Sequence, residues 1–334
     1  MNVRRGLALA LTLVLLSGCG AGEADDGALR IGVAVYKGDD TYIANMTNAL
    51  QDGVEAYCKN TGEKVYVTVS DAQESQAIQN DQIDRFLSLK YDVLCVNLVD
   101  RTDAGRVVDK ARAADVPVVF FNREPVREDL TSWNQVYYVG SDARESAVLQ
   151  AGIVLDLWER DRAALDLNGD GTLQYVMLEG ETRHQDTIIR TEVPIQCLKD
   201  AGIPLERLDG GSANWNRSQA AALTESYFEA HGDAVELIFC NNDDMALGAA
   251  DALSQMNRQF HNIVGIDGTP QGLEAVDAGK LLGTVVMDYT AHGNAIFRMA
   301  RTLAAGGDVT QVATIGEDHS VRIPMHVYTQ DTGT

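Results

Sequence analysis

The sequence predicts an α/β protein of two similar lobes, each with a parallel sheet covered by helices on both faces. Short runs rich in Val and Ile alternate with amphipathic helical stretches from residue 29 onward. Apolar strands joined by crossover helices are typical of buried parallel sheets. The alternation runs through twice, and roughly 300 residues follow the N-terminal leader, a length that favours two domains over one.

The strand candidates are short, mostly apolar runs, and the helical candidates place apolar residues on one face. In chain order the strand candidates are RIGVAV (30–35), KVYVTVS (64–70), VLCVNL (93–98), VPVVFF (116–121), QVYYVG (135–140), LQYVML (173–178), VELIFC (235–240), NIVGID (262–267), LGTVVM (282–287) and SVRIPMHVY (320–328). Helical candidates between them include residues 81–89, 104–113, 146–161, 218–230 and 245–257.

The N-terminus predicts export. Residues 1–5 are basic and residues 6–16 (GLALALTLVLL) form an apolar run shorter than the roughly 20 residues that span a bilayer, so residues 1–18 are expected to be a signal peptide. The sequence LSGC ending at Cys19 resembles a lipobox, which predicts lipidation of Cys19 and a flexible tether over residues 19–28. The alternative is an ordinary signal peptide in which Cys19 is incidental. The body is expected outside the cell membrane or in the periplasm.

Charge and cysteine content exclude some classes of partner. The chain has 49 acidic and 27 basic residues, a net charge of −22, and loss of the leader's two arginines makes it −24. Nucleic acid and anionic lipid headgroups are therefore not expected to bind the folded body. Cys95 and Cys240 lie in apolar runs and no C-x-x-C spacing occurs, whereas a bridge between Cys58 and Cys197 stays open.

Polar residues follow several strand candidates at the point where each strand ends. In open α/β sheets ligands bind beyond these carboxyl ends. Each residue alone is typical of turns and helix caps, but together the amides and carboxylates indicate a neutral ligand rich in hydroxyl groups. The residues are Tyr36, Asp40, Asn97, Asn122, Glu124, Asn242, Asp243 and Asp267.

This mixture suits a sugar. Carboxylates accept hydrogen bonds from hydroxyls, amides donate and accept, and an aromatic ring covers the apolar face of a pyranose. Trp215, in SANWNRS, is a candidate for stacking because its polar neighbours weaken the alternative of a core tryptophan. A phosphate ligand would need a glycine-rich loop or clustered cations, and neither pattern is present.

The stretch DLNGDGTLQ (166–174) matches the start of a calcium-binding loop. In the pattern D-x-[DN]-x-[DN]-G-x5-E, oxygens come from alternate positions and a glutamate closes the site at position twelve. That position is Met177, whose thioether does not bind a hard cation. From the loop alone, a calcium site and a simple turn before the next strand both remain open.

Longer motifs carry a family resemblance: IGVAVYKGDD, NDQID, NLVD, KARAADVPVVFFNREP, YYVGSDARES, DLNGDGTLQYVMLEGE, NNDDMALGA and VGIDGTPQGLEAV. From about residue 30 to 328 the chain resembles the glucose/galactose-binding proteins of bacterial ABC sugar uptake, which have the type I periplasmic-binding-protein fold. The resemblance implies two Rossmann-like lobes joined by a three-stranded hinge, with crossings near 116–118, 285–287 and 316–320. The N-terminal lobe would hold residues 29–116 plus 286–317, and the C-terminal lobe residues 117–285 plus 318–334.

The resemblance also implies a binding site for D-glucose or D-galactose. Its residues would be Tyr36, Asp40, Tyr42, Asn97, His184, Asp186, Arg190, Trp215, Asn242 and Asp267. Trp215 and Tyr42 would stack on the two ring faces, Tyr42 standing where the family usually has Phe. Met287, followed by Asp288, stands where the family has a sugar-binding Asn, and residues 182–183 are Thr-Arg instead of Pro-Gly. The exact sugar is therefore open.

In the same family a glutamate from a distant strand completes the calcium loop. Here the corresponding residue is Glu236, in VELIFC. The resemblance thus implies one structural calcium ion held by oxygens of Asp166, Asn168, Asp170, Thr172, Gln174 and Glu236.

The implied function is delivery of a monosaccharide by a lipid-anchored monomer to the membrane subunits of an ABC permease. A glycoside-active enzyme would use two carboxyl groups that flank the scissile bond, but the resemblance carries no such chemistry, so no enzymatic activity is expected. A sugar-responsive transcription factor would need a helix-turn-helix where this chain has its leader. A receptor-coupled sugar sensor for chemotaxis stays open beside the transport role.

Overall fold

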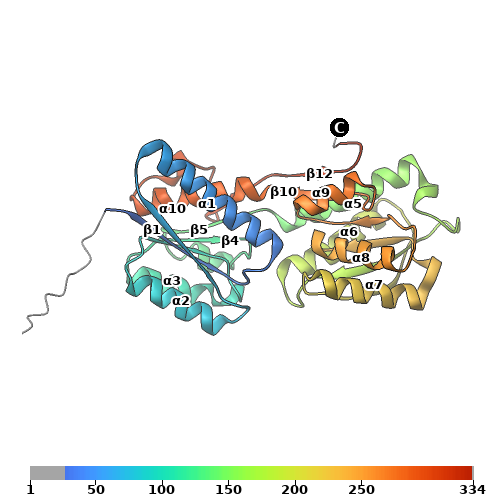
Figure 1. The fold of residues 1–334 in the computed structure, drawn as a ribbon, viewed down its shortest axis with the longest axis horizontal. Coiled ribbons are helices and arrows are strands. Elements are labelled where there is room, and N and C mark those ends of the chain that lie inside the picture. Colours follow the sequence, from blue (N-terminus) through green and yellow to red (C-terminus); the bar gives the residue numbers. More distant parts are fainter. Residues whose placement is uncertain (1–26, 333–334) are drawn as a thin grey trace, which may run out of the picture.

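The structure, a computed structural model, describes residues 27–332, so the predicted signal peptide and Cys19 lie outside the described residues. The predicted fold class is confirmed, since the chain forms two lobes with parallel sheets, side by side along the long axis of the molecule (Figure 1). None of the helices within residues 27–332 is long and apolar enough to cross a membrane.

The first lobe contains a six-stranded parallel sheet in the order β11-β5-β4-β3-β1-β2. Helices α1 and α10 cover one face, and α2 and α3 cover the other (Figure 1). The strands are β1 (Leu29–Val35), β2 (Val65–Asp71), β3 (Val93–Val96), β4 (Val118–Phe121), β5 (Val136–Gly140) and β11 (Ser320–Arg322). The helices are α1 (Thr41–Thr61), α2 (Gln76–Ser88), α3 (Ala104–Ala113), the short α4 (Arg127–Leu130) and α10 (Tyr289–Ala304).

The second lobe contains a four-stranded parallel sheet in the order β7-β6-β8-β9. Side chains along β6 alternate between two cores: Tyr175 and Met177 pack in one, Val176 and Leu178 in the other. This alternation is why a continuous apolar run suits a strand covered on both faces. The strands are β6 (Leu173–Glu179), β7 (Leu205–Ser212), β8 (Leu237–Cys240) and β9 (Ile263–Val264). The helices are α5 (Ala143–Arg160), α6 (Gln185–Asp200), α7 (Arg217–His231), α8 (Asp243–Gln255) and α9 (Pro270–Asp277).

The lobes are joined by three chain crossings, and the structure corrects two of their predicted places. Strand β4 pairs with β3 and β5 pairs with β4, so residues 117–140 belong to the first lobe and the chain first crosses at Ser141. Strand β11 pairs with β5, so the last crossing lies at residues 323–324, beyond the predicted 316–320. Strands β4 and β5 are as apolar as β6 and β8 of the second sheet, so composition does not reveal which sheet they join.

The remaining crossing, at residues 287–289, connects β10 (Thr284–Met287) to α10, close to the predicted 285–287. Strand β10 pairs antiparallel with β12 (Met325–Tyr328) beside the second lobe. The single strand predicted over 320–328 is therefore two strands, β11 and β12, that belong to different parts of the molecule. Pro324 stands between them, where it interrupts backbone pairing.

The cysteines of the described part are free thiols. Cys58 lies on α1 of the first lobe and Cys197 on α6 of the second. The disulfide left open at the sequence level is thus not formed in this structure.

Candidate functional site

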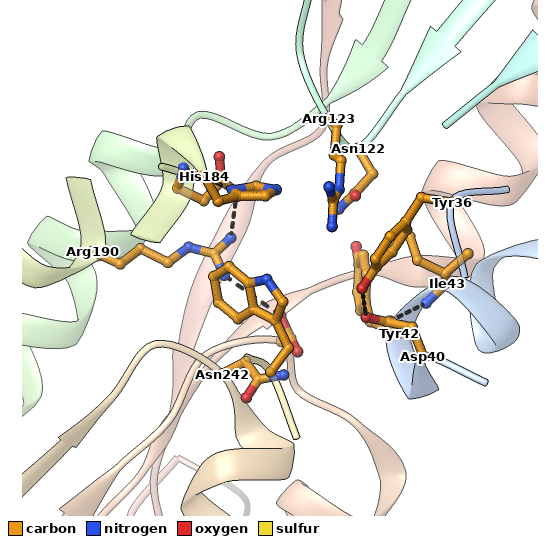
Figure 2. Close-up of a pocket in the computed structure, with 12 residues that line it drawn as sticks. Tyr36, Asp40, Tyr42, Ile43, Asn122, Arg123, His184, Arg190 and Asn242 are labelled. Carbon is orange, nitrogen blue, oxygen red and sulfur yellow. Dashed lines mark hydrogen bonds and ion pairs between the residues drawn. The ribbon is translucent and has the colours of Figure 1, made fainter. Parts of the chain in front are cut away.

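A cavity between the lobes gathers nine of the ten residues predicted for the ligand site. Side chains from both lobes point into it (Figure 2). The lining residues are Tyr36, Asp40, Tyr42, Ile43, Asn122, Arg123, His184, Asp186, Arg190, Trp215, Asn242 and Asp267.

Three lining residues sit at helix N-termini, where their side chains also cap the helix. Asp40 precedes α1 and its Oδ1 accepts from the backbone N of Ile43 at 3.0 Å. His184 caps α6 and Asn242 caps α8 in the same way. Caps are fixed by the backbone they satisfy, so these side chains are held in place before any ligand binds.

On the first-lobe wall, Tyr36 and Asp40 form one unit. The Tyr36 hydroxyl donates to Asp40 Oδ2 at 2.5 Å, and the Arg123 guanidinium carbon lies 3.7 Å from the centre of the Tyr36 ring. Burial and the neighbouring Asp40 carboxylate raise the pKa of Tyr36. This wall therefore presents a neutral phenol that is hydrogen-bonded to a carboxylate, with a cation over the phenol ring.

On the second-lobe wall, Arg190 is a buried guanidinium between two carboxylates. Its nitrogens lie 3.2 Å from Asp186 Oδ2 and 3.8 Å from Asp267 Oδ1, and one also donates to the backbone O of Asn241 at 3.1 Å. Arg190 is 4% exposed, and its Nε has no hydrogen-bond partner among residues 27–332. A buried donor without a partner is costly, so the described residues leave the hydrogen-bonding capacity of Arg190 incompletely used.

Asp267 occupies an unusual backbone conformation, with φ of 129°, in the loop between β9 and α9. Its backbone N donates to Val285 O and its backbone O accepts from Met287 N, so β10 holds the loop. Burial raises the pKa of Asp267, and the Arg190 guanidinium opposes that shift. Strain of this kind persists only where surrounding contacts over-determine it, and it is typical of functional positions.

Asp243 supports the Asp267 loop from behind. Its carboxylate, which is 0% exposed, accepts from the backbone N of Thr269 at 2.8 Å and from the Thr284 hydroxyl at 2.5 Å. Burial raises the pKa of Asp243 to about 7. The residue thus links the start of α8, the loop before α9 and strand β10.

Trp215 lies in the loop between β7 and α7 and meets His184 edge to face, with ring centres 5.2 Å apart. The indole packs directly over Gly180, where an added Cβ would stand 2.2 Å from the ring. A residue with a side chain at position 180 would displace the indole from the cavity wall. The small residue after β6 is therefore part of how the ring is placed.

Asn97 is the one predicted residue that does not line the cavity. It is 0% exposed, and its amide Nδ2 donates to Asn122 Oδ1 at 3.0 Å while its Oδ1 accepts from the backbone N of Tyr36. Asn97 therefore lies behind the wall, and Asn122 takes the predicted place. The site implied by the resemblance lacks Asn122 and Arg123, although Asn122 is among the polar residues that follow the strand candidates. Neither the strand-end pattern nor the resemblance predicted Arg123.

Contacts between the lobes close the cavity at two places. Arg123 of the first lobe donates to Glu181 Oε1 of the second at 2.7 Å, and the Thr41 hydroxyl donates to Asp244 Oδ2 at 2.6 Å. Glu124 contributes to neither contact, because it pairs with Arg322 within the first lobe. The cavity has three carboxylates and two guanidinium groups on its walls.

The predicted calcium residues meet at one end of the second lobe. Glu236, 0% exposed, accepts from the backbone N of Asn168 at 3.0 Å and from that of Gln174 at 3.1 Å. Asp170 accepts from the backbone N of Thr172, and Asp166 from that of Gly171. The structure thus brings the distant Glu236 against the loop, as the resemblance implies.

The atoms that the six predicted calcium residues offer can be compared with what a cation requires. Within residues 27–332 no three His, Cys, Asp or Glu side chains stand close enough to hold a metal ion as they are placed. The carboxylates of Asp166, Asp170 and Glu236 accept from nearby backbone N–H groups instead. Yet the six residues offer only oxygen, and in the described chain no Lys, Arg or His pairs with the buried Glu236; Arg162 pairs with Asp166 at 3.1 Å. Such an oxygen set fits a hard divalent cation.

His184 predicts a pH dependence of ligand affinity. Burial in the closed cavity lowers its pKa from 6.5 to about 4, whereas water in an open cleft would restore the ordinary value. Closing then expels a proton below pH 6.5, so affinity falls as the pH drops toward 4, by at most about tenfold per pH unit. In titrations between pH 4 and 7, wild-type affinity should fall by up to about a hundredfold relative to His184→Gln. A constant ratio between the two proteins would contradict the expected shift.

Comparison with known proteins gives the family. Residues 31–308 match the family described as periplasmic binding protein domain. The D-galactose/methyl-galactoside binding periplasmic protein of Haemophilus influenzae is 35% identical over 319 residues, which cover 95% of this chain and 93% of that protein. A xylitol-binding protein of Mycolicibacterium smegmatis is 28% identical, over 88% of this chain and 78% of that one.

Solved structures agree with this assignment. An ABC transporter solute-binding protein of Bacillus halodurans, with bound myo-inositol, superposes with a TM-score of 0.75 at 29% identity, covering 91% of this chain and 95% of that one. The two parallel-sheet lobes, the three crossings and the cavity between them are accounted for by one assignment: the chain belongs to the periplasmic binding protein family.

Proposed function

We propose that this protein binds a single monosaccharide, D-galactose or D-glucose, between its lobes and delivers it to an ABC permease. The observation that carries the proposal is the composition of the cavity: carboxylates on both walls, the buried Arg190, whose Nε has no partner among residues 27–332, and Trp215 beside His184. Carboxylates accept from sugar hydroxyls, guanidinium donates to them, and an aromatic face covers the ring. The name of the Haemophilus influenzae relative supports the choice of galactose.

Cavity closure supports a small ligand. The Arg123–Glu181 and Thr41–Asp244 contacts cross between the lobes beside the lining residues, so an oligosaccharide would have to break them. Binding without chemistry is supported by the state of the carboxylates. Asp186 and Asp267 pair with Arg190, and Asp40 accepts from Tyr36, so each serves as a fixed acceptor.

The test is a calorimetric titration of tether-deleted protein against galactose, glucose, ribose, xylose, xylitol and myo-inositol. The proposal expects one galactose or glucose per protein, bound at least tenfold more tightly than the polyols and pentoses, a difference of about 1.4 kcal/mol. Preference for a polyol or a pentose would overturn the choice of sugar. Sustained release of a product from galactosides would overturn the binding role itself.

Met287 is expected to weaken discrimination between the sugar and one of its deoxy analogues. Its thioether sulfur accepts from Arg190 Nη2 at 3.3 Å, a weak acceptor for a buried guanidinium. The resemblance places a sugar-binding Asn at position 287, and Met287 has no amide to replace it. One sugar hydroxyl then lacks its partner, so the analogue without that hydroxyl should bind within about threefold of the parent sugar. Met287→Asn should restore discrimination against that analogue by about tenfold or more. Equal losses for every deoxy sugar in the wild type would count against this reading of Met287.

For the loop 166–174 and Glu236 we propose one calcium ion with a structural role. Asp166, Asn168, Asp170, Thr172, Gln174 and Glu236 would hold it, and its charge would offset the buried carboxylate. The residues belong to the second lobe alone, and none of them lines the ligand cavity. The ion is therefore proposed to stabilise one lobe without touching the sugar.

The delivery role completes the proposal. A lipid on Cys19 would keep the monomeric protein near the permease, with residues 19–28 as its tether. A chemotaxis receptor is the second candidate partner, because the same closed form would present the same lobe surfaces to either membrane protein. Uptake of labelled galactose in cells carrying Cys19→Ala tests the anchor: transport should fall while purified protein binds normally.

A further inference from the structure

His292 lies where the ligand cavity meets the hinge. The residue belongs to α10 and is 1% exposed. Its Nδ1 lies 2.8 Å from the backbone O of Asp288, and its Nε2 lies 3.2 Å from Ser141 Oγ. Ser141 Oγ also lies 2.8 Å from the backbone O of Ile323, so its single hydrogen bonds either that oxygen or His292 Nε2. Asp288, Ser141 and Ile323 stand at the three chain crossings, so the imidazole and the Ser141 hydroxyl lie among all three.

The same imidazole contacts a wall of the cavity. The Tyr42 hydroxyl lies 3.4 Å from His292 Nδ1, and the two rings meet edge to face with centres 6.2 Å apart. Because a backbone carbonyl only accepts, Nδ1 carries the hydrogen donated to Asp288. The Tyr42 oxygen therefore accepts at this contact, and its own hydrogen is left for an acceptor elsewhere. Tyr42 lines the cavity and is 5% exposed.

We infer that His292 is a positioning residue that couples the placement of Tyr42 to closure of the hinge. Rotation of one lobe against the other changes the relative directions of the three crossings. A side chain that contacts two crossings directly and lies next to the third through Ser141 favours one arrangement. In this structure that arrangement is the one in which Arg123–Glu181 and Thr41–Asp244 join the lobes. The inference rests on the proposed function, since it assigns His292 a part in retaining the sugar.

The kinetic consequence separates this role from general stabilisation. Sugar enters the open cleft, so the encounter does not depend on the His292 contacts, whereas escape requires that they break. His292→Leu should therefore raise the dissociation rate of galactose by about tenfold and change the association rate by less than about twofold. Stopped-flow fluorescence, with Trp215 in the cavity as the reporter, measures both rates.

Further variants show whether His292 acts through Tyr42 and the crossings. His292→Gln, whose amide both donates and accepts, should restore the dissociation rate to within about threefold of wild type. Tyr42→Phe should raise the dissociation rate. The double variant with His292→Leu should dissociate no faster than His292→Leu alone, because both substitutions remove the same Tyr42–His292 contact. His231→Leu is the matched control: His231 pairs with Asp209 inside the second lobe and should leave the dissociation rate unchanged.

A ligand-free measurement keeps the inference testable whichever sugar binds. Small-angle scattering without sugar should give a larger radius of gyration for His292→Leu than for wild type, because the His292 contacts hold a fraction of the ligand-free molecules closed, and His231→Leu should leave the radius unchanged. Equal radii, or a lower melting temperature with unchanged dissociation, would overturn the inference. If wild type binds no sugar of the panel, the proposed function fails, and the scattering comparison still decides the role of His292 at the hinge.

Discussion

Asp267→Ala is expected to weaken galactose binding by about a hundredfold or more, which corresponds to about 2.7 kcal/mol. The substitution removes a charged acceptor for sugar hydroxyls, and such hydrogen bonds contribute about 1.5–3 kcal/mol each. It also leaves Arg190, 4% exposed, with Asp186 as its remaining ion-pair partner among residues 27–332. Calorimetry on the variant and the wild type measures the change.

Asp251→Ala is the matched control for this loss. Asp251 also belongs to the second lobe and pairs with an arginine, Arg217, at 2.7 Å, but both side chains of that pair are 45% exposed and neither lines the cavity with Arg190. Exposed pairs contribute about 0–1 kcal/mol, so affinity and stability should change little. Equal affinities for Asp267→Ala and wild type would remove Asp267 from the ligand site.

Removal of calcium is expected to lower the stability of the second lobe while sugar affinity stays the same. An ion bound only by the folded state contributes about 2.7 kcal/mol when its free concentration is a hundred times the dissociation constant. Chelation should therefore lower the melting temperature, and Glu236→Gln should reproduce much of the loss, since Glu236 is the buried carboxylate that brings the strand to the loop.

Glu206→Gln serves as the control for Glu236→Gln, because Glu206 is an exposed carboxylate on β7 of the same lobe. Its melting temperature should respond to chelator as the wild type does. If chelator leaves the melting temperature of the wild type unchanged, residues 166–174 form a turn that binds no stabilising ion. Loss of sugar binding in chelated but folded protein would instead place the ion in the ligand site.

Nine of the ten predicted residues line one cavity, and some of them also have a structural role that the sequence pattern reveals. Asp40 and Asn242 follow buried strands and cap helices, so position in the pattern was enough to find them. Asn97 follows a strand in the same way, yet its amide faces inward to Asn122 and Tyr36. The pattern of strand ends gives the edge of the sheet, but which of two neighbouring amides faces the ligand depends on packing.

The fold was predictable to the level of its strands and less so to the level of their partners. Strand β7, LERLDGGS, was missed because charged residues and two glycines hide a strand at the sheet edge. The lobe boundary was misplaced because β4 and β5 are as apolar as the strands of the second sheet. Periodicity reports burial, whereas strand pairing depends on contacts between distant segments of the chain.

Two lobes that close on a monosaccharide should become more compact when the sugar binds. Small-angle scattering with and without D-galactose and D-glucose measures this change. The structure has its lobes in contact through Arg123–Glu181 and Thr41–Asp244, and these contacts must open for a sugar to enter. We expect a smaller radius of gyration on adding galactose or glucose, complete at one sugar per protein, and no change with a sugar that fails to bind. The same scattering curve with and without every sugar, in protein that calorimetry finds saturated, would contradict it.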